Sequence, residues 1–99
     1  MLITWDENKN RSNQAKHKVS FEVAGLIFND PLHLSRLDRV VDGEERWQTI
    51  GSVGGVVLLL VAHTWVDDGA ETAIRIISAR KANSHERKRY EEGIDRGSA

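Results

Sequence analysis

The apolar run from Val56 to Ala62 places the strongest constraint on the fold of this 99-residue chain. Its seven residues are all apolar, so both faces of the segment must be buried. A glycine-rich turn at 51–55 precedes it, and an Asp-Asp-Gly turn at 67–69 follows it. Because a helix needs about twenty apolar residues to cross a bilayer, the run is too short to do so. We therefore expect the central strand of a sheet and no contact with membranes.

Segments on both sides of this run have the two-residue alternation of strands. Residues 45–50 alternate polar and bulky side chains, and 73–78 are rich in β-branched residues. Residues 32–41 form an imperfect strand that ends at Asp42-Gly43, a strong hairpin signal. These segments predict a mainly antiparallel sheet of four strands. Within 45–50, the alternation assigns Glu45, Trp47 and Thr49 to one face and Arg46, Gln48 and Ile50 to the other.

Three helices are expected around this sheet. The first runs from about Asp6 to Lys16 after a short apolar opening, with Thr4 and Glu7 at capping-box spacing. A second follows Ser20 and extends through Phe28 until Asp30-Pro31 stops it. A third begins near Ser84, where Asn83 and Glu86 have the spacing of a capping box. Lys9, Asn13 and Lys16 fall on one face of the first helix, which should be basic and rich in hydrogen-bonding groups.

The expected architecture is one α+β domain over residues 1–99, with two N-terminal helices, one C-terminal helix and all helices on one face of the sheet. The tail at 91–99 should be frayed. The chain has no cysteine, which excludes disulfides and thiolate zinc sites and suits a reducing cytoplasm. No signal peptide is visible, so we expect a cytoplasmic protein.

The charges are unevenly distributed although the net charge is only −1. Residues 9–18 carry four basic side chains and no acid, whereas 22–71 carry nine acids and three arginines. Residues 80–90 carry five positive charges and one negative. Two basic segments therefore flank an acidic middle. This pattern is compatible with a polyanion on one surface and a basic partner on another.

Metal and nucleophile chemistry find little support in the sequence. His17, His33, His63 and His85 lie on different elements without ligand spacing, and no serine sits in a nucleophile elbow. We therefore expect no metal and no cofactor. RNA cleavage needs neither a metal nor a protein nucleophile, because the substrate's own 2′-hydroxyl attacks the phosphate. The protein has only to stabilise charge and transfer protons. The residue types allow this chemistry, but they equally allow a non-catalytic interaction module.

The order of several motifs resembles the BrnT family of toxins. The opening, W-D-x-x-K-x-x-x-N-x-x-K-H-x-V-S-F, is matched from Trp5 to Phe21. Further blocks follow in the same order: F-x-D-P at 28–31, E-E-R-W-x-x-I-G at 44–51, R-x-I-S-A-R-K-A at 75–82, then Glu86-Arg87 and Tyr90. Lys18 stands where the family commonly has glycine. Because glycine suits a left-handed helix terminus, we expect mild strain or a different turn there.

The resemblance implies a RelE-like fold and a small, metal-independent bacterial endoribonuclease that cleaves RNA by 2′-hydroxyl attack and stops growth. It also implies a cognate BrnA-like antitoxin with a ribbon-helix-helix domain, and contact with operator DNA only through that antitoxin. If the chain were instead a non-catalytic module, antitoxin binding and operon repression would be its main function. The residues in the matching blocks become the catalytic candidates, namely Arg80, Arg75, His17, Lys16, Glu45 and Arg46. Lys9, Lys81 and Arg87 are expected to bind RNA.

Overall fold

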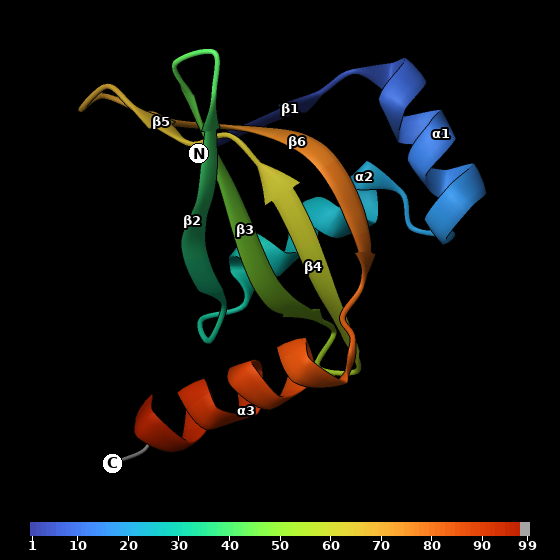
Figure 1. Ribbon diagram of the computed structural model, residues 1–99, viewed down its shortest axis with the longest axis vertical. Coiled ribbons are helices and arrows are strands. Elements are labelled where there is room, and N and C mark those ends of the chain that lie inside the picture. The colour runs from blue at the N-terminus through green and yellow to red at the C-terminus, as the bar shows by residue number, and fades with distance from the viewer. Residues whose placement is uncertain (98–99) are drawn as a thin grey trace.

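The computed structural model describes residues 1–97, which form a mixed sheet with helices on both faces (Figure 1). Over these residues the sheet has six strands in the order β1-β6-β4-β3-β2, with β5 pairing to β6. The prediction of four strands is therefore wrong. The apolar opening adds β1 as an edge strand parallel to β6, and a two-residue β5 pairs antiparallel with β6. The strands are β1 (Leu2–Trp5), β2 (Leu34–Val41), β3 (Glu44–Val53), β4 (Val57–His63), β5 (Val66–Asp67) and β6 (Thr72–Lys81).

The predicted antiparallel meander is present, with longer strands than expected. Asp42 and Gly43 have φ of 50° and 77°, so both residues of the β2–β3 turn are left-handed, as a type I′ hairpin requires. β3 continues to Val53, so the turn to β4 is shorter than the predicted turn at 51–55. Gly54 and Gly55 are its left-handed residues. β6 continues to Lys81. Arg80 and Lys81 were expected beyond the end of this strand, but they belong to it because they pair with β4.

The helices are α1 (Glu7–His17), α2 (Phe21–Ala24), the 3₁₀ helix η1 (Gly25–Asn29) and α3 (Ser84–Gly97). The N-cap of α1 is Asp6, whose carboxylate accepts a hydrogen bond from the Lys9 amide, so the prediction of a Thr4 cap is wrong. The second predicted helix divides into α2 and η1. The capping box of α3 is confirmed: Asn83 and Glu86 each accept the other's amide hydrogen bond at 2.9 Å. α3 extends to Gly97, and the last two residues of the tail lie outside the described residues.

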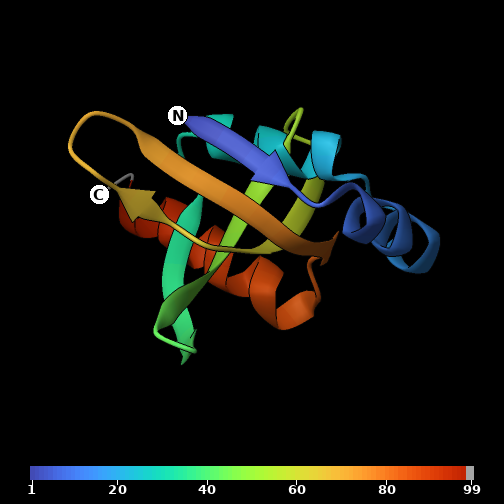
Figure 2. The same cartoon turned by 90° about the horizontal axis from the view of Figure 1, so that it is seen from above.

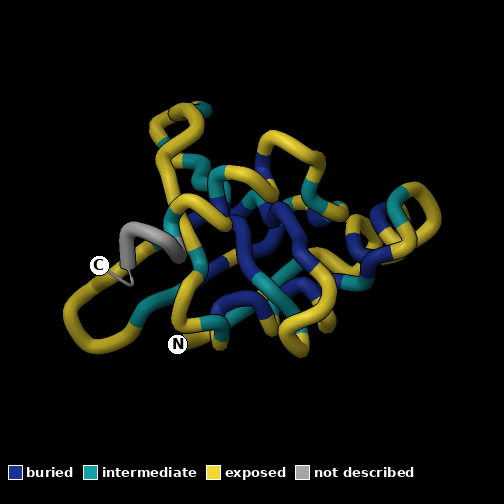
Figure 3. The backbone as a smooth tube through the Cα atoms, turned by 90° about the horizontal axis from the view of Figure 1, so that it is seen from below, coloured by how far each residue is buried: buried dark blue, intermediate teal, exposed yellow. Residues whose placement is uncertain are grey.

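The two faces of the sheet carry separate cores, so the prediction that all helices cover one face is wrong. α2 and η1 lie on one face, which we call the α2 face, and α3 lies across the other, the α3 face (Figure 2). Because β4 is apolar on both sides, it contributes to both cores and lies in the buried centre of the sheet (Figure 3). The α2-face core includes Phe21, Ile27, Leu59, Val61, Ile74 and Ile76. The smaller α3-face core consists of Ile50, Leu58, Leu60 and Tyr90.

Gly51 lets η1 approach β3 closely. A Cβ atom at this position would lie 2.7 Å from Ile27 Cβ and 3.0 Å from the Ile27 carbonyl oxygen. Neither atom is the free end of a flexible side chain, so any larger residue would force η1 away from the sheet. The glycine therefore serves packing and not phosphate binding.

A hydrogen-bonded carboxylate anchors α3 to the rest of the molecule. The Tyr90 hydroxyl donates to Asp30 Oδ2 at 2.6 Å, and the same oxygen accepts the Ser52 amide at 2.8 Å. Burial and this bond raise the pKa of Tyr90 to about 12. Burial also works against the charge on Asp30, but its hydrogen bonds from Tyr90 and the backbone outweigh that effect and lower its pKa.

Two asparagines dock α1 onto the rest of the domain, Asn13 onto β6 and Asn10 onto α2. The Asn13 side chain is buried, donates to the Ala79 carbonyl at 2.8 Å and accepts the Ala79 amide at 3.1 Å. The Asn13 side chain therefore provides hydrogen-bond partners for the backbone groups of Ala79, at the edge of β6 beyond the point where β1 pairing ends. Asn10 accepts the Phe21 amide in the same manner. The predicted basic face of α1 is thus divided, because Asn13 points at the sheet while Lys9 and Lys16 are exposed.

Candidate active site

All five arginines in the strands of the described residues lie on the α3 face: Arg36, Arg39, Arg46, Arg75 and Arg80. The cross-strand pairs place them there. Arg36 pairs with Gln48 and Arg39 with Arg46, in line with Ile50 of the α3-face core. Arg80 pairs with Leu60 of the same core. Arg75 lies between Ile74 and Ile76, which face the opposite core. The strands thus gather positive charge on one side of the sheet.

Two β-bulges make this arrangement possible. Arg75 and Arg80 are five residues apart, an odd spacing that would send them to opposite faces of a regular strand. The register shift in β6 leaves Ile77 unpaired, so that both arginines reach the α3 face. A second shift, at Asp38 in β2, does the same for Arg36 and Arg39.

Arg80 is held by Glu86 in a two-point ion pair. Its two terminal nitrogens donate to the two carboxylate oxygens at 2.7 and 2.9 Å. Glu86 is only 8% exposed and also caps α3, so its carboxylate is fixed from two sides. The hydrogen bond from Arg80 lowers the pKa of Glu86 and raises that of Arg80, which keeps both groups charged. Arg80 remains partly exposed, with 39% of its side chain accessible.

A cavity of about 190 Å³ brings His17 beside Arg80. It is lined by His17, Gln48, Leu60, Ala62, Ser78, Ala79 and Arg80. The docking of α1 explains this placement, because Asn13 is bonded to Ala79 and His17 follows one helical turn later on the same side. His17 is the last residue of α1, which ends at Lys18 with a φ of 61°. Of the two alternatives expected at Lys18, mild strain or a different turn, the structure has the first, because the left-handed terminus is kept and a lysine adopts it less readily than a glycine.

A second ionic cluster lies near the β2–β3 hairpin. Glu44 accepts hydrogen bonds from Arg75 at 2.8 Å and from Arg46 at 3.2 Å. The bond from Arg75 is the main reason that the pKa of Glu44 is lowered. Arg75 lies five residues from Arg80 along β6, which corresponds to roughly 16 Å at the usual rise of a strand. The structure therefore does not bring Arg75 and Arg46 to the pocket that holds Arg80 and His17.

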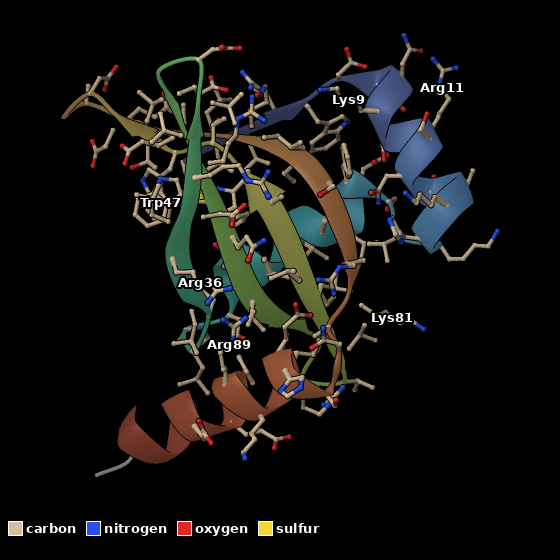
Figure 4. All side chains as sticks on the ribbon, viewed as in Figure 1. Lys9, Arg11, Arg36, Trp47, Lys81 and Arg89 are labelled. Atoms are coloured by element: carbon tan, nitrogen blue, oxygen red, sulfur yellow. The ribbon has the colours of Figure 1, made fainter. Side chains whose placement is uncertain are left out.

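The remaining predicted residues lie away from this pocket. Glu45 pairs with Val40 on the α2 face, opposite the arginines. Lys16 is exposed and does not line the cavity, although it adjoins His17. Lys81 follows Arg80 on β6 and faces the other side, and Lys9 extends from α1 into solvent, as Figure 4 shows. Arg87 is exposed on α3.

Four residues at or near this pocket were missed by sequence reasoning: Arg36, Gln48, Ser78 and Arg89. The alternation in 45–50 placed Gln48 on the same face as Arg46 and Ile50, so the pattern could have identified Gln48 as a candidate. Arg36 was hidden because the bulge in β2 interrupts the alternation of that strand. Ser78 and Arg89 carry no pattern of their own, and only the packing of β6 and α3 brings them near the cavity.

Within residues 1–97, no group of three or more His, Cys, Asp or Glu side chains is arranged to hold a metal ion. His63 is an example of a structural histidine. Its ring is buried between the Thr49 hydroxyl and the Thr64 carbonyl, and burial lowers its pKa. None of the described helices is both long enough and apolar enough to cross a membrane.

Comparison with known proteins connects this chain to a family. The chain matches the sequence model of the family described as ribonuclease toxin, BrnT, of type II toxin-antitoxin system over residues 5–86. It is similar to the 1.1 Å crystal structure of the Brucella abortus ribonuclease toxin BrnT, with 31% identity and a TM-score of 0.60 over 85% of this chain and 99% of that chain. A search of curated proteins found no match.

These findings confirm the predicted toxin function and give no support to the non-catalytic alternative. A toxin of a type II system is paired with a cognate antitoxin, so the chain has such a partner. The match covers α1, both bulged strands and the Arg80–Glu86 pair. The chain therefore belongs to the BrnT family of ribonuclease toxins of type II toxin–antitoxin systems.

Proposed function

We propose that the cavity between α1 and β6 is the active site, where RNA is cleaved by attack of a 2′-hydroxyl on the adjacent phosphate. The observation that carries this proposal is the shared pocket of His17 and Arg80, a proton-transfer group beside a fixed cation. Ser78 and Gln48 add hydrogen-bonding groups to the same wall. The surrounding arginines of the α3 face attract the RNA backbone, with Lys9, Lys81 and Arg87 contributing charge at longer range.

The chemistry requires one bond to form and one to break. The 2′-oxygen attacks phosphorus, the bond from phosphorus to the 5′-oxygen breaks, and the products are a 2′,3′-cyclic phosphate and a 5′-hydroxyl. Arg80 stabilises the extra negative charge on the phosphate oxygens. His17 takes the proton from the 2′-hydroxyl and delivers a proton to the 5′-oxygen as it leaves. Lys16, at the rim beside His17, supplies further positive charge.

Because the nucleophile belongs to the substrate, the reaction needs no metal to generate one. We therefore expect purified toxin to cleave RNA in the presence of EDTA and to leave cyclic phosphate ends. An RNA with a single 2′-deoxynucleotide at the cleaved position should resist cleavage there. Cleavage of that substituted position would overturn the mechanism, and a strict requirement for a divalent cation would overturn metal independence.

Arg80 gives the sharpest genetic test. Expression of the intact chain should stop bacterial growth, and Arg80→Ala should relieve the arrest at matched protein levels. Because Arg80→Ala also leaves the buried Glu86 carboxylate unpaired, Arg80→Lys serves as the matched variant: it keeps a charge for Glu86 but lacks the planar fork. Both variants should be soluble and folded by circular dichroism. If folded Arg80→Ala arrests growth as well as the intact chain does, Arg80 is not the catalytic cation.

We further infer that the chain acts as one RelE-like domain in the cytoplasm and that its antitoxin is BrnA-like, with a ribbon-helix-helix domain that alone contacts operator DNA. A basic antitoxin segment would bind the edge strand β2 more favourably than it would bind the arginine-rich α3 face. β2 is exposed, with Val40 59% accessible, and Glu45 and Asp42 lie beside it. Glu45→Lys should weaken antitoxin binding in calorimetry and leave RNA cleavage unchanged. Unchanged antitoxin affinity would remove this edge from the interface.

A further inference from the structure

A second cavity of about 130 Å³ opens on the α3 face between the sheet and α3. Its floor is apolar and is made by Leu34, Ile50 and Leu60. Arg36, Gln48 and Arg89 also line it and supply polar and cationic groups. An apolar floor with a few convergent polar groups is the usual composition of a site for a flat organic ligand. The family match does not assign any ligand to this cavity.

The second cavity adjoins the proposed active site. Gln48 and Leu60 line both cavities, so a ligand in one lies directly beside a ligand in the other. The Gln48 side chain carries an acceptor oxygen and a donor nitrogen, which can bind the edge of a heterocyclic base. A nucleotide strand with its phosphate at Arg80 would thus have a neighbouring base at this second cavity.

Two arginines border this cavity from opposite sides. Arg36 comes from β2 and Arg89 from α3, and Figure 4 shows their side chains extending toward one another across the space between the two elements. Neither forms a salt bridge with a side chain among the described residues. Their guanidinium groups are therefore available to a ligand that stacks on their planes or carries negative charge, although the charge of Arg89 also acts on Glu86 and lowers the pKa of that carboxyl.

α3 packs closely against Leu34, one of the floor residues of this cavity. A Cβ atom at Gly93 would lie 2.9 Å from Leu34 Cδ1. The glycine therefore lets α3 approach Leu34 without moving its side chain.

We propose that this cavity binds one unstacked nucleobase of the RNA strand, adjacent to the phosphate held at Arg80. The base lies on Leu34, Ile50 and Leu60, stacks against Arg36, and presents its edge to Gln48. This inference rests on the proposed function for its substrate class. Proteins that read RNA commonly splay single-stranded bases onto aromatic or arginine planes in this way.

Binding of uncleavable RNA tests the base pocket separately from catalysis. Short oligonucleotides with 2′-O-methyl groups throughout lack the nucleophile, and a single abasic site can be moved along them. For the intact protein, one abasic position should weaken binding by about tenfold, the usual contribution of one stacked base, while other positions change it little. Arg36→Leu should remove that position-specific penalty. Arg36→Lys should also remove it while keeping the salt dependence, because lysine keeps the charge but has no plane to stack.

Arg39→Leu is the matched control, because it removes a charge from the same strand and face at a residue that does not line the cavity. It should weaken binding of all oligonucleotides equally and leave the abasic penalty intact. If no abasic position is penalised, or if Arg36→Leu and Arg39→Leu change the penalty alike, the base pocket is refuted. Failure of the proposed function has a different signature: absence of cleavage in ordinary RNA, whatever the binding pattern.

Discussion

Substitutions at Glu86 should separate the two roles of its carboxylate, which caps α3 and also holds Arg80. Glu86→Gln keeps an oxygen to accept the Asn83 amide but loses the charge that pairs with Arg80. Glu86→Ala loses both interactions. A capping interaction contributes about 1 kcal/mol to the free energy of unfolding. A hydrogen-bonded ion pair contributes about 1.5–3 kcal/mol when buried, which we reduce to about 1–2 kcal/mol because the Arg80 side chain is 39% exposed.

We therefore expect Glu86→Ala to lower the free energy of unfolding by about 2–3 kcal/mol and Glu86→Gln by about 1–2 kcal/mol. For a domain of this size these values correspond to losses in Tm of about 10–20 °C and about 5–10 °C. Urea denaturation followed by tryptophan fluorescence measures both, provided that the transition is two-state. Equal losses for the two variants would refute the separate capping contribution.

Acid provides an internal check on the same pair. The bond to Arg80 lowers the pKa of Glu86 below its ordinary value of 4.5 in the folded protein. The stabilisation is therefore fully present above that ordinary value and is lost as the pH falls through the lower, folded pKa. The stability difference between the native protein and Glu86→Gln should shrink on acidification. A difference that stays constant across this range would show that the carboxylate charge contributes nothing.

Three further predictions follow from particular contacts. Lys18→Gly should raise the free energy of unfolding by roughly 0.5–1 kcal/mol, measured by urea denaturation, because glycine adopts the left-handed φ of 61° without strain. Gly51→Ala should lower the free energy of unfolding by at least about 1–3 kcal/mol, since the new methyl group would overlap Ile27; an unchanged Tm would refute this packing argument. Tyr90 should stay protonated up to its pKa of about 12 in a spectrophotometric titration, and stability should decline between its ordinary value of 10.0 and that pH; Tyr90→Phe should abolish this alkaline loss.

Local signals in the sequence predicted the elements well where a turn or cap was encoded by specific residues. The Asp42-Gly43 hairpin and the Asn83/Glu86 capping box are confirmed because their chemistry depends on neighbours in the chain. The distribution of helices between two faces was missed, because the apolar run of β4 shows that both faces are covered but not by which helix. The apolar opening was not counted as a strand of the sheet, since its parallel pairing to β6 depends on residues far away in the chain.

The site was predictable in its residue types more than in its geometry. Arg80 and His17 do share a pocket, but this depends on Asn13, which was assigned to a basic surface and is in fact buried against Ala79. Glu45 was grouped with these residues although strand alternation already placed it opposite Arg46.

The two β-bulges tie the number of residues between the arginines to the pairing register of the strands. With Ile77 in place, Arg75 and Arg80 are five residues apart, so a β6 paired without its bulge would force one of them into the apolar core of the α2 face, at a cost of several kcal/mol for an unpaired charge. Loss of Ile77 together with the bulge would leave the two arginines four residues apart, an even spacing that keeps both on the α3 face. Asp38 has the same position in β2. The register of these strands is therefore as much a determinant of the cationic surface as the arginines themselves.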